Sequence, residues 1–197
     1  MKMRLNNKGV TFIEILIVFV IVGLMLTFGV VGINTFFSKN KVRRAATDLL
    51  QNMRLARTMA IKENRVYRVI MDYNNQAYYV GFDGNADGDL LDADDGFGTG
   101  SVKMIAINRY GDKIVLGSNK FSVTPPNGPN GTTISNAVSF TFNPDGSAGG
   151  PGSVYIQQTT RGYTYCVRLS NAAGKIDLYI WNGDKNNQNV VSWSEIR

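Results

Sequence analysis

The stretch Lys8-Gly9-Val10-Thr11-Phe12-Ile13-Glu14 decides the fold, because it opens an apolar run that continues to Phe37. Glu14 is the only charged residue in that run. About 20 apolar residues suffice to cross a bilayer, so we predict a transmembrane helix over residues 10–37. A carboxylate costs about 2.5 to 3.5 kcal/mol at the centre of such a helix and less near the interface, where it can reach lipid headgroups. Glu14 therefore needs a reason to be there.

The nine residues before this run are short and basic. A secretory signal would place its apolar region ahead of a small-residue cleavage site such as Ala-x-Ala, and none follows here in the usual place. We therefore expect the apolar segment to be retained. Basic residues flank it on both sides, so the positive-inside rule leaves its orientation nearly tied. These residues are Lys2, Arg4 and Lys8 before it and Lys39, Lys41, Arg43 and Arg44 after it.

Composition restricts the kind of protein further. The 197 residues can hold one membrane segment and one globular domain of about 130 residues. The chain has no histidine, which removes the commonest general base and transition-metal ligand. Cys166 is the single cysteine, so no intramolecular disulfide can form, and we expect a half-buried core residue there. Removal of Lys2, Arg4 and Lys8 with a leader would lower the net charge from +6 to +3, which is too little to indicate nucleic-acid binding.

Residues 38–65 have the pattern of an amphipathic helix. No proline interrupts residues 10–65, which predicts one continuous helix. Its apolar stripe, at steps of three and four residues, consists of Val42, Ala45, Leu49, Met53, Ala56 and Ala60. The basic residues of this segment fall mostly off the stripe. They could contact lipid headgroups or DNA, and the alternative is a solvent-exposed helix face. These residues are Arg43, Arg44, Arg54, Arg57 and Lys62.

Beyond residue 65 the periodicity changes to two, which predicts a β domain over residues 66–197. Two hairpins are expected, from residues 66–72 with 76–82 and from 102–108 with 113–116. Later strands are expected at 137–143, 153–158, 163–170 and 175–181, the last with one core face and one partly wet face. The proline-rich and glycine-rich segment 124–131 should be an exposed connection.

The N-terminal motif resembles a known family. Gly9 followed by Val-Thr-Phe-Ile-Glu and a long apolar helix is similar to the class III leader of type IV pilins and type II secretion pseudopilins. The resemblance implies that a prepilin peptidase cuts between Gly9 and Val10, so that residues 1–9 are a leader peptide. It further implies N-methylation of Val10 and an assembly role for Glu14 as the fifth mature residue. Val10 departs mildly from the Phe or Met usual at the first mature position.

Physical chemistry agrees with this assembly role. Cleavage would free a cationic α-amino group at Val10, with which Glu14 of a neighbouring subunit could pair in an apolar filament core. An unpaired charge is heavily penalised there, so the pairing would set the register of the subunits.

Later segments resemble one branch of that superfamily, the GspH/FimT-type minor pseudopilins. The helical stretch Ala56-Arg57-Thr58-Met59-Ala60-Ile61 is similar to their Ala-Arg-x-x-Ala-Ile. Phe142-Asn143-Pro144-Asp145-Gly146 is similar to a Phe-x-Pro-x-Gly turn of the family. The resemblance extends thinly to about Trp181, and the Asn-rich tail 182–197 lies outside it.

An acidic loop carries a candidate calcium site. Asp83 to Asp94 has the spacing of a calcium loop, with glycine at the sixth position and oxygens at the first, third, fifth and twelfth. The candidate ligands are Asp83, Asn85, Asp87, Asp89 through its carbonyl, and Asp94. Leu91 offers no side-chain oxygen and Asp replaces the usual Glu at the twelfth position, so an acidic loop kept soluble by its charge is the alternative. No cofactor is required for the expected function, and Ca²⁺ is the one candidate.

A second candidate site is basic. Some FimT-type proteins that bind DNA carry Gly-Arg-x-Arg near the C-terminus, and Gly174-Lys175-Ile176-Asp177 matches it only at Gly174 and the basic Lys175. Asp177 would repel phosphate, so DNA is not the expected partner. Arg161, Arg168 and Lys175 could still form a small basic patch for DNA; strand-edge solvation is the alternative.

These observations predict an α+β, type IV pilin-like fold, with a long N-terminal helix, half in the membrane and half packed on an antiparallel sheet. The implied function is that of a minor pseudopilin in a type II secretion pseudopilus, not an enzyme. Expected partners are other pseudopilins or pilins, prepilin peptidase, the inner-membrane secretion platform and membrane lipid. The chain would cross the inner membrane once, with a cytoplasmic N-terminus before processing and a periplasmic β domain. The alternatives are a minor pilin of a type IV pilus, with DNA uptake as its task, and a stand-alone membrane-anchored binding protein.

Overall fold

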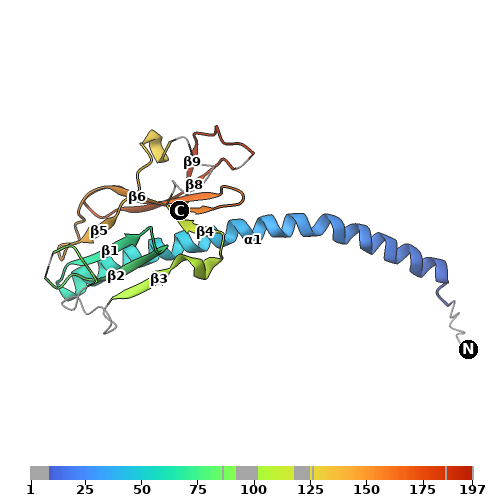
Figure 1. The fold of residues 1–197 in the computed structure, drawn as a ribbon, viewed down its shortest axis with the longest axis horizontal. Coiled ribbons are helices and arrows are strands. Elements are labelled where there is room, and N and C mark those ends of the chain that lie inside the picture. The colour runs from blue at the N-terminus through green and yellow to red at the C-terminus, as the bar shows by residue number, and fades with distance from the viewer. Residues whose placement is uncertain are drawn as a thin grey trace, which may run out of the picture. The chain divides into compact units, whose positions relative to one another are not determined.

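The computed structural model describes residues 9–85, 87–91, 102–117, 125, 127–184 and 186–196, and gives only the backbone of residues 26–35. One long helix precedes a β region (Figure 1). The helix α1 comprises Phe12–Glu63, and the strands are β1 (Tyr67–Asp72), β2 (Ala77–Phe82), β3 (Lys103–Ala106), β4 (Ile114–Leu116), β5 (Ser139–Phe142), β6 (Gly152–Gln158), β7 (Thr164–Leu169), β8 (Ile176–Trp181) and β9 (Trp193–Ile196). Two short 3₁₀ helices, η1 (Ile107–Tyr110) and η2 (Pro129–Gly131), lie in the connections.

The strands form two antiparallel sheets where one was predicted. The four-stranded sheet has the order β3-β2-β1-β5 and the five-stranded sheet the order β4-β6-β7-β8-β9. The hairpin of β1 and β2 is confirmed, with Asp72 opposite Ala77. The predicted hairpin of residues 102–108 with 113–116 is wrong, because β3 pairs with β2 and β4 pairs with β6. Helix η1 turns the chain from one sheet to the other, so a short connection does not here imply pairing.

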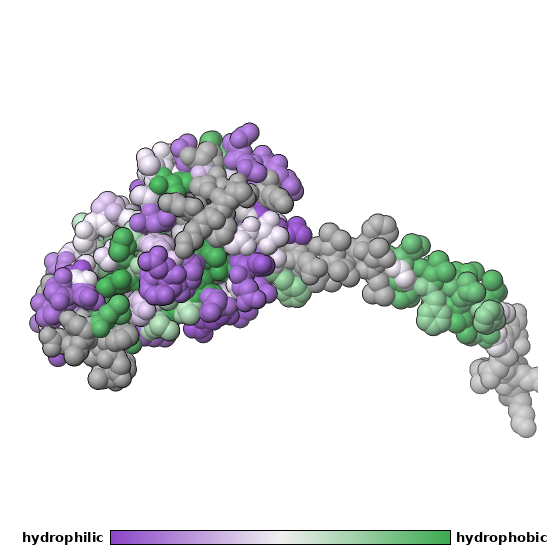
Figure 2. All heavy atoms as spheres, in the orientation of Figure 1, coloured by the Kyte–Doolittle hydropathy of each residue, from purple (hydrophilic) through white to green (hydrophobic). Residues whose placement is uncertain are grey.

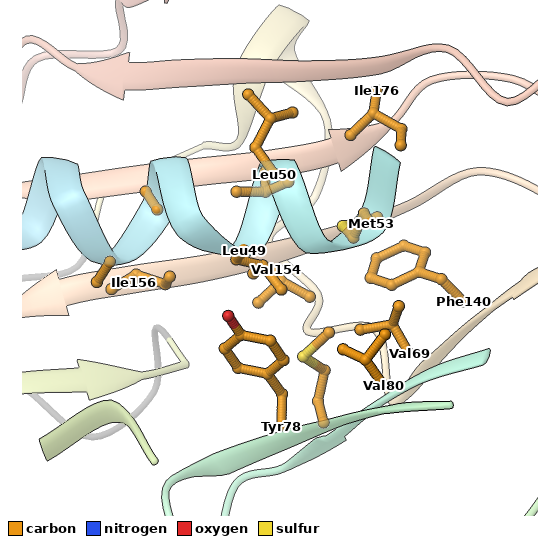
Figure 3. Packing of buried hydrophobic residues seen from close by; sticks show 14 of the residues in the cluster. Leu49, Leu50, Met53, Val69, Tyr78, Val80, Phe140, Val154, Ile156 and Ile176 are labelled. Carbon is orange, nitrogen blue, oxygen red and sulfur yellow. The ribbon is translucent and has the colours of Figure 1, made fainter. Parts of the chain in front are cut away.

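The predicted apolar stripe of the helix is confirmed as its core face. Every residue of that stripe is at most 1% exposed. Leu49, Leu50 and Met53 point among side chains of both sheets, including Val69 and Ile156 (Figure 3). Burial of each such side chain contributes about 1.5 to 3 kcal/mol, so this half of α1 is a principal source of core stability.

Both ends of α1 have recognisable caps. Thr11 precedes the first helical residue and Glu14 stands three residues after it, which is the spacing of a capping box. At the other end Asn64 has a φ of 54°, and the amide of Arg65 donates to the carbonyl of Ala60. That is a Schellman-type ending, in which asparagine takes the left-handed position that glycine often fills. The helix therefore begins two residues later and ends two residues earlier than predicted.

The chain divides into two compact units, residues 1–38 and 39–197. The described part of the first unit is helical from Phe12 onward, and its apolar side chains lie at the surface, as the green region of Figure 2 shows. Among the described residues, no helix combines the length and the apolar character that crossing a membrane requires. The span predicted over residues 10–37 is therefore not confirmed, and it includes the ten residues whose side chains lie outside the description.

The outer face of the five-stranded sheet is covered, which the sequence pattern did not indicate. In β8 the face predicted to be partly wet is buried, with Asp177 at 7% and Trp181 at 2% exposure. The cover includes the segment predicted to be an exposed connection, in which Pro125 and Pro129 are buried. Asn127 in that segment accepts a hydrogen bond at its carbonyl from the indole of Trp193 in β9, at 2.7 Å. The Asn-rich tail thus supplies strand β9 and helps hold the cover.

Candidate functional site

The predicted cleavage site lies in an exposed segment without regular structure. Gly9 and Val10 precede the helix, and Val10 is 71% exposed. A Cβ placed on Gly9 meets nothing within 4 Å, so no contact with the described residues requires glycine there.

Glu14 lies on the first turn of α1 and completes the capping box. Its Oε2 accepts hydrogen bonds from the backbone N–H and the hydroxyl of Thr11, each at 2.8 Å. The hydroxyl oxygen of Thr11 in turn accepts from the amide of Glu14 at 3.3 Å. The reciprocal bonds satisfy amides that a helix leaves unpaired at its N-terminus. The carboxylate is solvent-exposed, so it remains accessible to a cation from another molecule.

The segments that carry the family resemblance meet at one side chain, that of Arg57. Its Nε donates to the carbonyl of Gly146 and its Nη2 to the carbonyl of Ala173, both at 2.9 Å. Gly146 and Gly174 have positive φ angles of 81° and 77°. A Cβ on Gly174 would lie 2.5 Å from Nε of Arg57, so this glycine leaves room for the guanidinium. The helical arginine therefore ties two turns to α1, which is a structural role in place of lipid or DNA contact.

The acidic loop is organised by internal hydrogen bonds. Asp83 is buried and forms an ion pair with Arg68, whose Nη1 also donates to Thr141 at 2.9 Å. Oδ2 of Asp83 accepts the amide of Gly88 at 3.2 Å, while its Oδ1 has no hydrogen-bond partner among the described residues. The carboxylate of Asp87 accepts the amide of Asp89 at 2.8 Å.

The described part of the loop does not test the predicted calcium site as a whole. Within the described chain, no group of three acidic, histidine or cysteine residues is placed to hold a metal ion. Asp94, the predicted twelfth-position ligand, lies outside the described residues. At the first position, Arg68 already supplies a positive charge to Asp83. Calcium binding therefore stays a hypothesis.

The three basic residues predicted as a patch do not form one. Arg161 follows β6 and Lys175 precedes β8, so they lie at opposite ends of β7, about 20 Å apart at roughly 3.3 Å per residue. Arg168, within β7, donates to the carbonyl of Pro129 and the hydroxyl of Thr132, and so holds the cover in place.

Lys175 is also occupied, because its ammonium pairs with Asp177 at 3.0 Å. Burial raises the pKa of Asp177, but the Ser170 hydroxyl at 2.6 Å and the Lys175 ammonium outweigh that effect and lower the pKa below its usual value. Asp177, which breaks the DNA-binding motif, is thus the ionised centre of a local network.

Comparison with known families decides the assignment of the chain. The profile of the prokaryotic N-terminal methylation motif matches residues 4–30, which include the proposed cleavage site. The profile described as type II transport protein GspH matches residues 45–173, more than half of the chain. The chain belongs to the GspH family. The family and the motif together indicate a membrane-anchored protein whose folded domain faces the periplasm.

Two solved structures match this chain at low sequence identity. The type IV minor pilin FimU of Pseudomonas aeruginosa is 16% identical, with a TM-score of 0.48 over 73% of this chain and 91% of that one. The minor pseudopilin EpsH of the type 2 secretion system of Vibrio cholerae is 12% identical, with a TM-score of 0.42 over 70% of this chain and 95% of that one. A comparison with curated proteins finds no match.

Sequence reasoning missed two contributors that the GspH chain uses. Thr11 caps the helix, and the Thr-x-x-Glu spacing ahead of an apolar run was available as a signal. The sequence marks Arg57 as a basic residue off the apolar stripe and as part of the Ala-Arg-x-x-Ala-Ile stretch, but no local pattern could name its partners, because they lie more than 80 residues away.

Proposed function

We propose that this GspH protein is a minor pseudopilin that assembles into the pseudopilus of a type II secretion system and helps to export folded proteins across the outer membrane. The observation that carries the proposal is the family match over residues 45–173 together with the methylation motif over residues 4–30. The role is structural and needs no catalytic group.

The proposed maturation begins at the exposed N-terminal segment. Prepilin peptidase cuts between Gly9 and Val10, and the new N-terminus is methylated. The apolar residues 10–37 anchor the chain in the inner membrane as a single span, with the leader cytoplasmic before cleavage and the β domain periplasmic. The inner-membrane secretion platform would then move the subunit into the growing filament together with other pseudopilins.

The proposed assembly contact is an ion pair between subunits. The amino group freed at Val10 is a cation, and Glu14 of a neighbouring subunit is the anion nearest in sequence to that end. In an apolar surrounding the pairing is strongly favoured over two separate charges, so it would set the axial register. The capping box supports this role, since Thr11 orients the carboxylate through Oε2.

Variants at two positions separate the charge from the cap. Glu14→Gln keeps a hydrogen-bond acceptor for Thr11 but removes the charge, whereas Thr11→Ala removes the cap hydroxyl and keeps the charge. We expect these two variants, and Glu14→Ala as a third, to be inserted and cleaved. Only Glu14→Gln and Glu14→Ala should fail to enter the filament, which is measured as the fraction of the subunit found in sheared filaments. Normal incorporation of Glu14→Gln would rule out the ion pair, and a defect confined to Thr11→Ala and Glu14→Ala would assign the effect to the helix cap.

Co-purification tests the choice of machine. Crosslinked complexes should contain the secretion platform and other pseudopilins, whereas a type IV pilus subunit would bring pilus fibre and the retraction motor. The DNA-uptake alternative has little structural support, because Arg168 and Lys175 are held in intramolecular contacts. A salt-sensitive gel shift with duplex DNA that Lys175→Ala abolishes would revive it.

A further inference from the structure

A basic groove lies where α1 passes the 3₁₀ helix η1. It has a volume of about 490 Å³ and is lined by Lys41, Arg44 and Asp48 from α1 and by residues 108–111. Three of its side chains are cations, those of Lys41, Arg44 and Arg109, and one is a carboxylate, that of Asp48. The groove therefore carries a net charge of +2.

The cations of the groove are available for a ligand. Lys41, Arg44 and Arg109 are exposed. In the described chain the ion pairs are Arg68 with Asp83 and Lys175 with Asp177, and neither involves these three side chains. The guanidinium of Arg109 lies 5.5 Å from the ring centroid of Tyr110, which keeps it near the groove without neutralising it.

The walls of the groove are held by a half-buried polar network. The hydroxyl of Tyr110 donates to Oδ2 of Asp48 at 2.7 Å and so fixes η1 to α1. Asn52 donates to the hydroxyl of Tyr78 in β2 at 2.9 Å and to the backbone carbonyl of Asp48. The carboxylate of Asp48 thus already has a donor within the wall, and the groove is formed before any ligand arrives.

The floor of the groove admits the stem of a long basic side chain. Gly111 has a φ of 131°, and a Cβ built there would lie 3.5 Å from Cδ and 3.6 Å from Nζ of Lys41. The lysine therefore lies over a glycine, with its ammonium at the groove. Two guanidinium groups and an ammonium around one concave site form the donor set that phosphate oxygens prefer.

We propose that this groove binds the phosphate of an anionic phospholipid headgroup. Lys41 follows Phe37, the end of the apolar run, by only four residues, so the groove begins close in sequence to the segment proposed as the membrane anchor. Basic residues beside a membrane segment attract anionic lipid. A concave site of this volume suits one headgroup, whereas duplex DNA needs a strip of phosphate contacts along its length. The inference rests on the membrane anchoring in the proposed function.

Native mass spectrometry of the full chain in non-ionic detergent tests the assignment. The probes are phosphatidylglycerol, which is anionic, phosphatidylcholine, which has a phosphate but no net charge, inorganic phosphate, and a short DNA duplex. We expect phosphatidylglycerol to bind about tenfold more tightly than phosphatidylcholine. We expect the triple variant Lys41→Gln, Arg44→Gln, Arg109→Gln to lose that preference.

A charge-matched control removes three basic residues elsewhere, Lys62→Gln, Arg65→Gln and Lys103→Gln, and should keep the preference. An equal loss of the lipid preference in both triple variants, or equal binding of the two lipids by the parent chain, would show that the groove is not an anionic-lipid site. Displacement of phosphatidylglycerol by inorganic phosphate at a similar concentration would show that the groove binds free phosphate and not a lipid headgroup. Tighter binding of duplex DNA to the same side chains would show that the ligand is a nucleic acid. The same spectra report whether the leader is removed, so a failure of the proposed maturation is read separately from a failure of lipid binding.

Discussion

Arg57 joins α1 to two turns by two hydrogen bonds, and Gly174 makes room for it. We expect Gly174→Ala to destabilise the β domain through both its left-handed φ and the 2.5 Å approach to Arg57. Gly131 is the matched control, because its φ of 72° is similar but a Cβ there meets nothing within 4 Å. Gly131→Ala should cost about 1 kcal/mol, and Gly174→Ala about 2 kcal/mol more. Urea unfolding followed by tryptophan fluorescence measures both, and equal losses would contradict the packing role of Arg57.

Asp177 should make the stability of the folded protein depend on pH in the acidic range. Its pKa is lowered in the folded protein, so its contribution is fully present above the unfolded value of about 3.9 and is lost as the pH falls through the lowered folded pKa. We expect Asp177→Asn to remove this part of the acid dependence, seen as a flatter curve of melting temperature between about pH 2 and 5. An unchanged curve would show that the network with Ser170 and Lys175 does not bias the protonation of Asp177.

At the scale of elements, β9 protects a small second core. Trp193 packs edge-on against Tyr155, with ring centroids 5.9 Å apart, and Tyr155 belongs to the same cluster as the buried Cys166. Burial raises the pKa of the Cys166 thiol to about 12, so the native thiol should be unreactive.

Trp193→Ala should uncover that second core. We expect a loss of about 2 kcal/mol in the free energy of unfolding and faster maleimide labelling of Cys166. Val191→Ala, at a side chain that is 61% exposed, is the control and should label as slowly as the parent protein. Labelling of the Trp193 variant at the parent rate would mean that β9 does not protect the thiol.

The loop after β2 gives a prediction about charge. Arg68→Met leaves the carboxylate of Asp83 buried without its cation, which should cost about 3 kcal/mol of stability. Asp83→Asn in the same background should recover much of that loss, since it removes the unpaired charge. The same experiment includes melting curves with EDTA and with excess Ca²⁺. If the loop binds calcium, chelation should lower the melting temperature. If the Arg68–Asp83 ion pair alone holds the loop, chelation should not change it.

For the molecule as a whole, a substitution at Gly9 should affect processing without affecting folding. A Cβ at this position meets nothing, so Gly9→Ala should leave the melting temperature unchanged. We expect the variant to keep residues 1–9, because the glycine is needed by the peptidase, while the parent chain begins at Val10 and carries one added methyl group. Intact-mass measurement of protein from membranes distinguishes the two, and a cleaved Gly9→Ala chain would contradict the proposed recognition.

The sequence by itself determined the helix and most of the strands, and it predicts the maturation site. The long helix, its apolar stripe and eight strands follow from periodicity and turn residues, which are local properties. The motif from Gly9 to Glu14 is equally local, because the proposed cleavage site and the helix cap both lie in this one short stretch.

Only the tertiary structure decided how those elements are joined. Residues 103–106 and 114–116 enter different sheets, β9 arises from a polar tail, and the predicted basic patch is dispersed over two ends of β7. The partners of Arg57 and the walls of the basic groove come from segments far apart in the chain. The physical reason is that periodicity specifies which face of an element is buried, whereas strand pairing and buried polar contacts depend on which distant groups can satisfy one another in a single packed core.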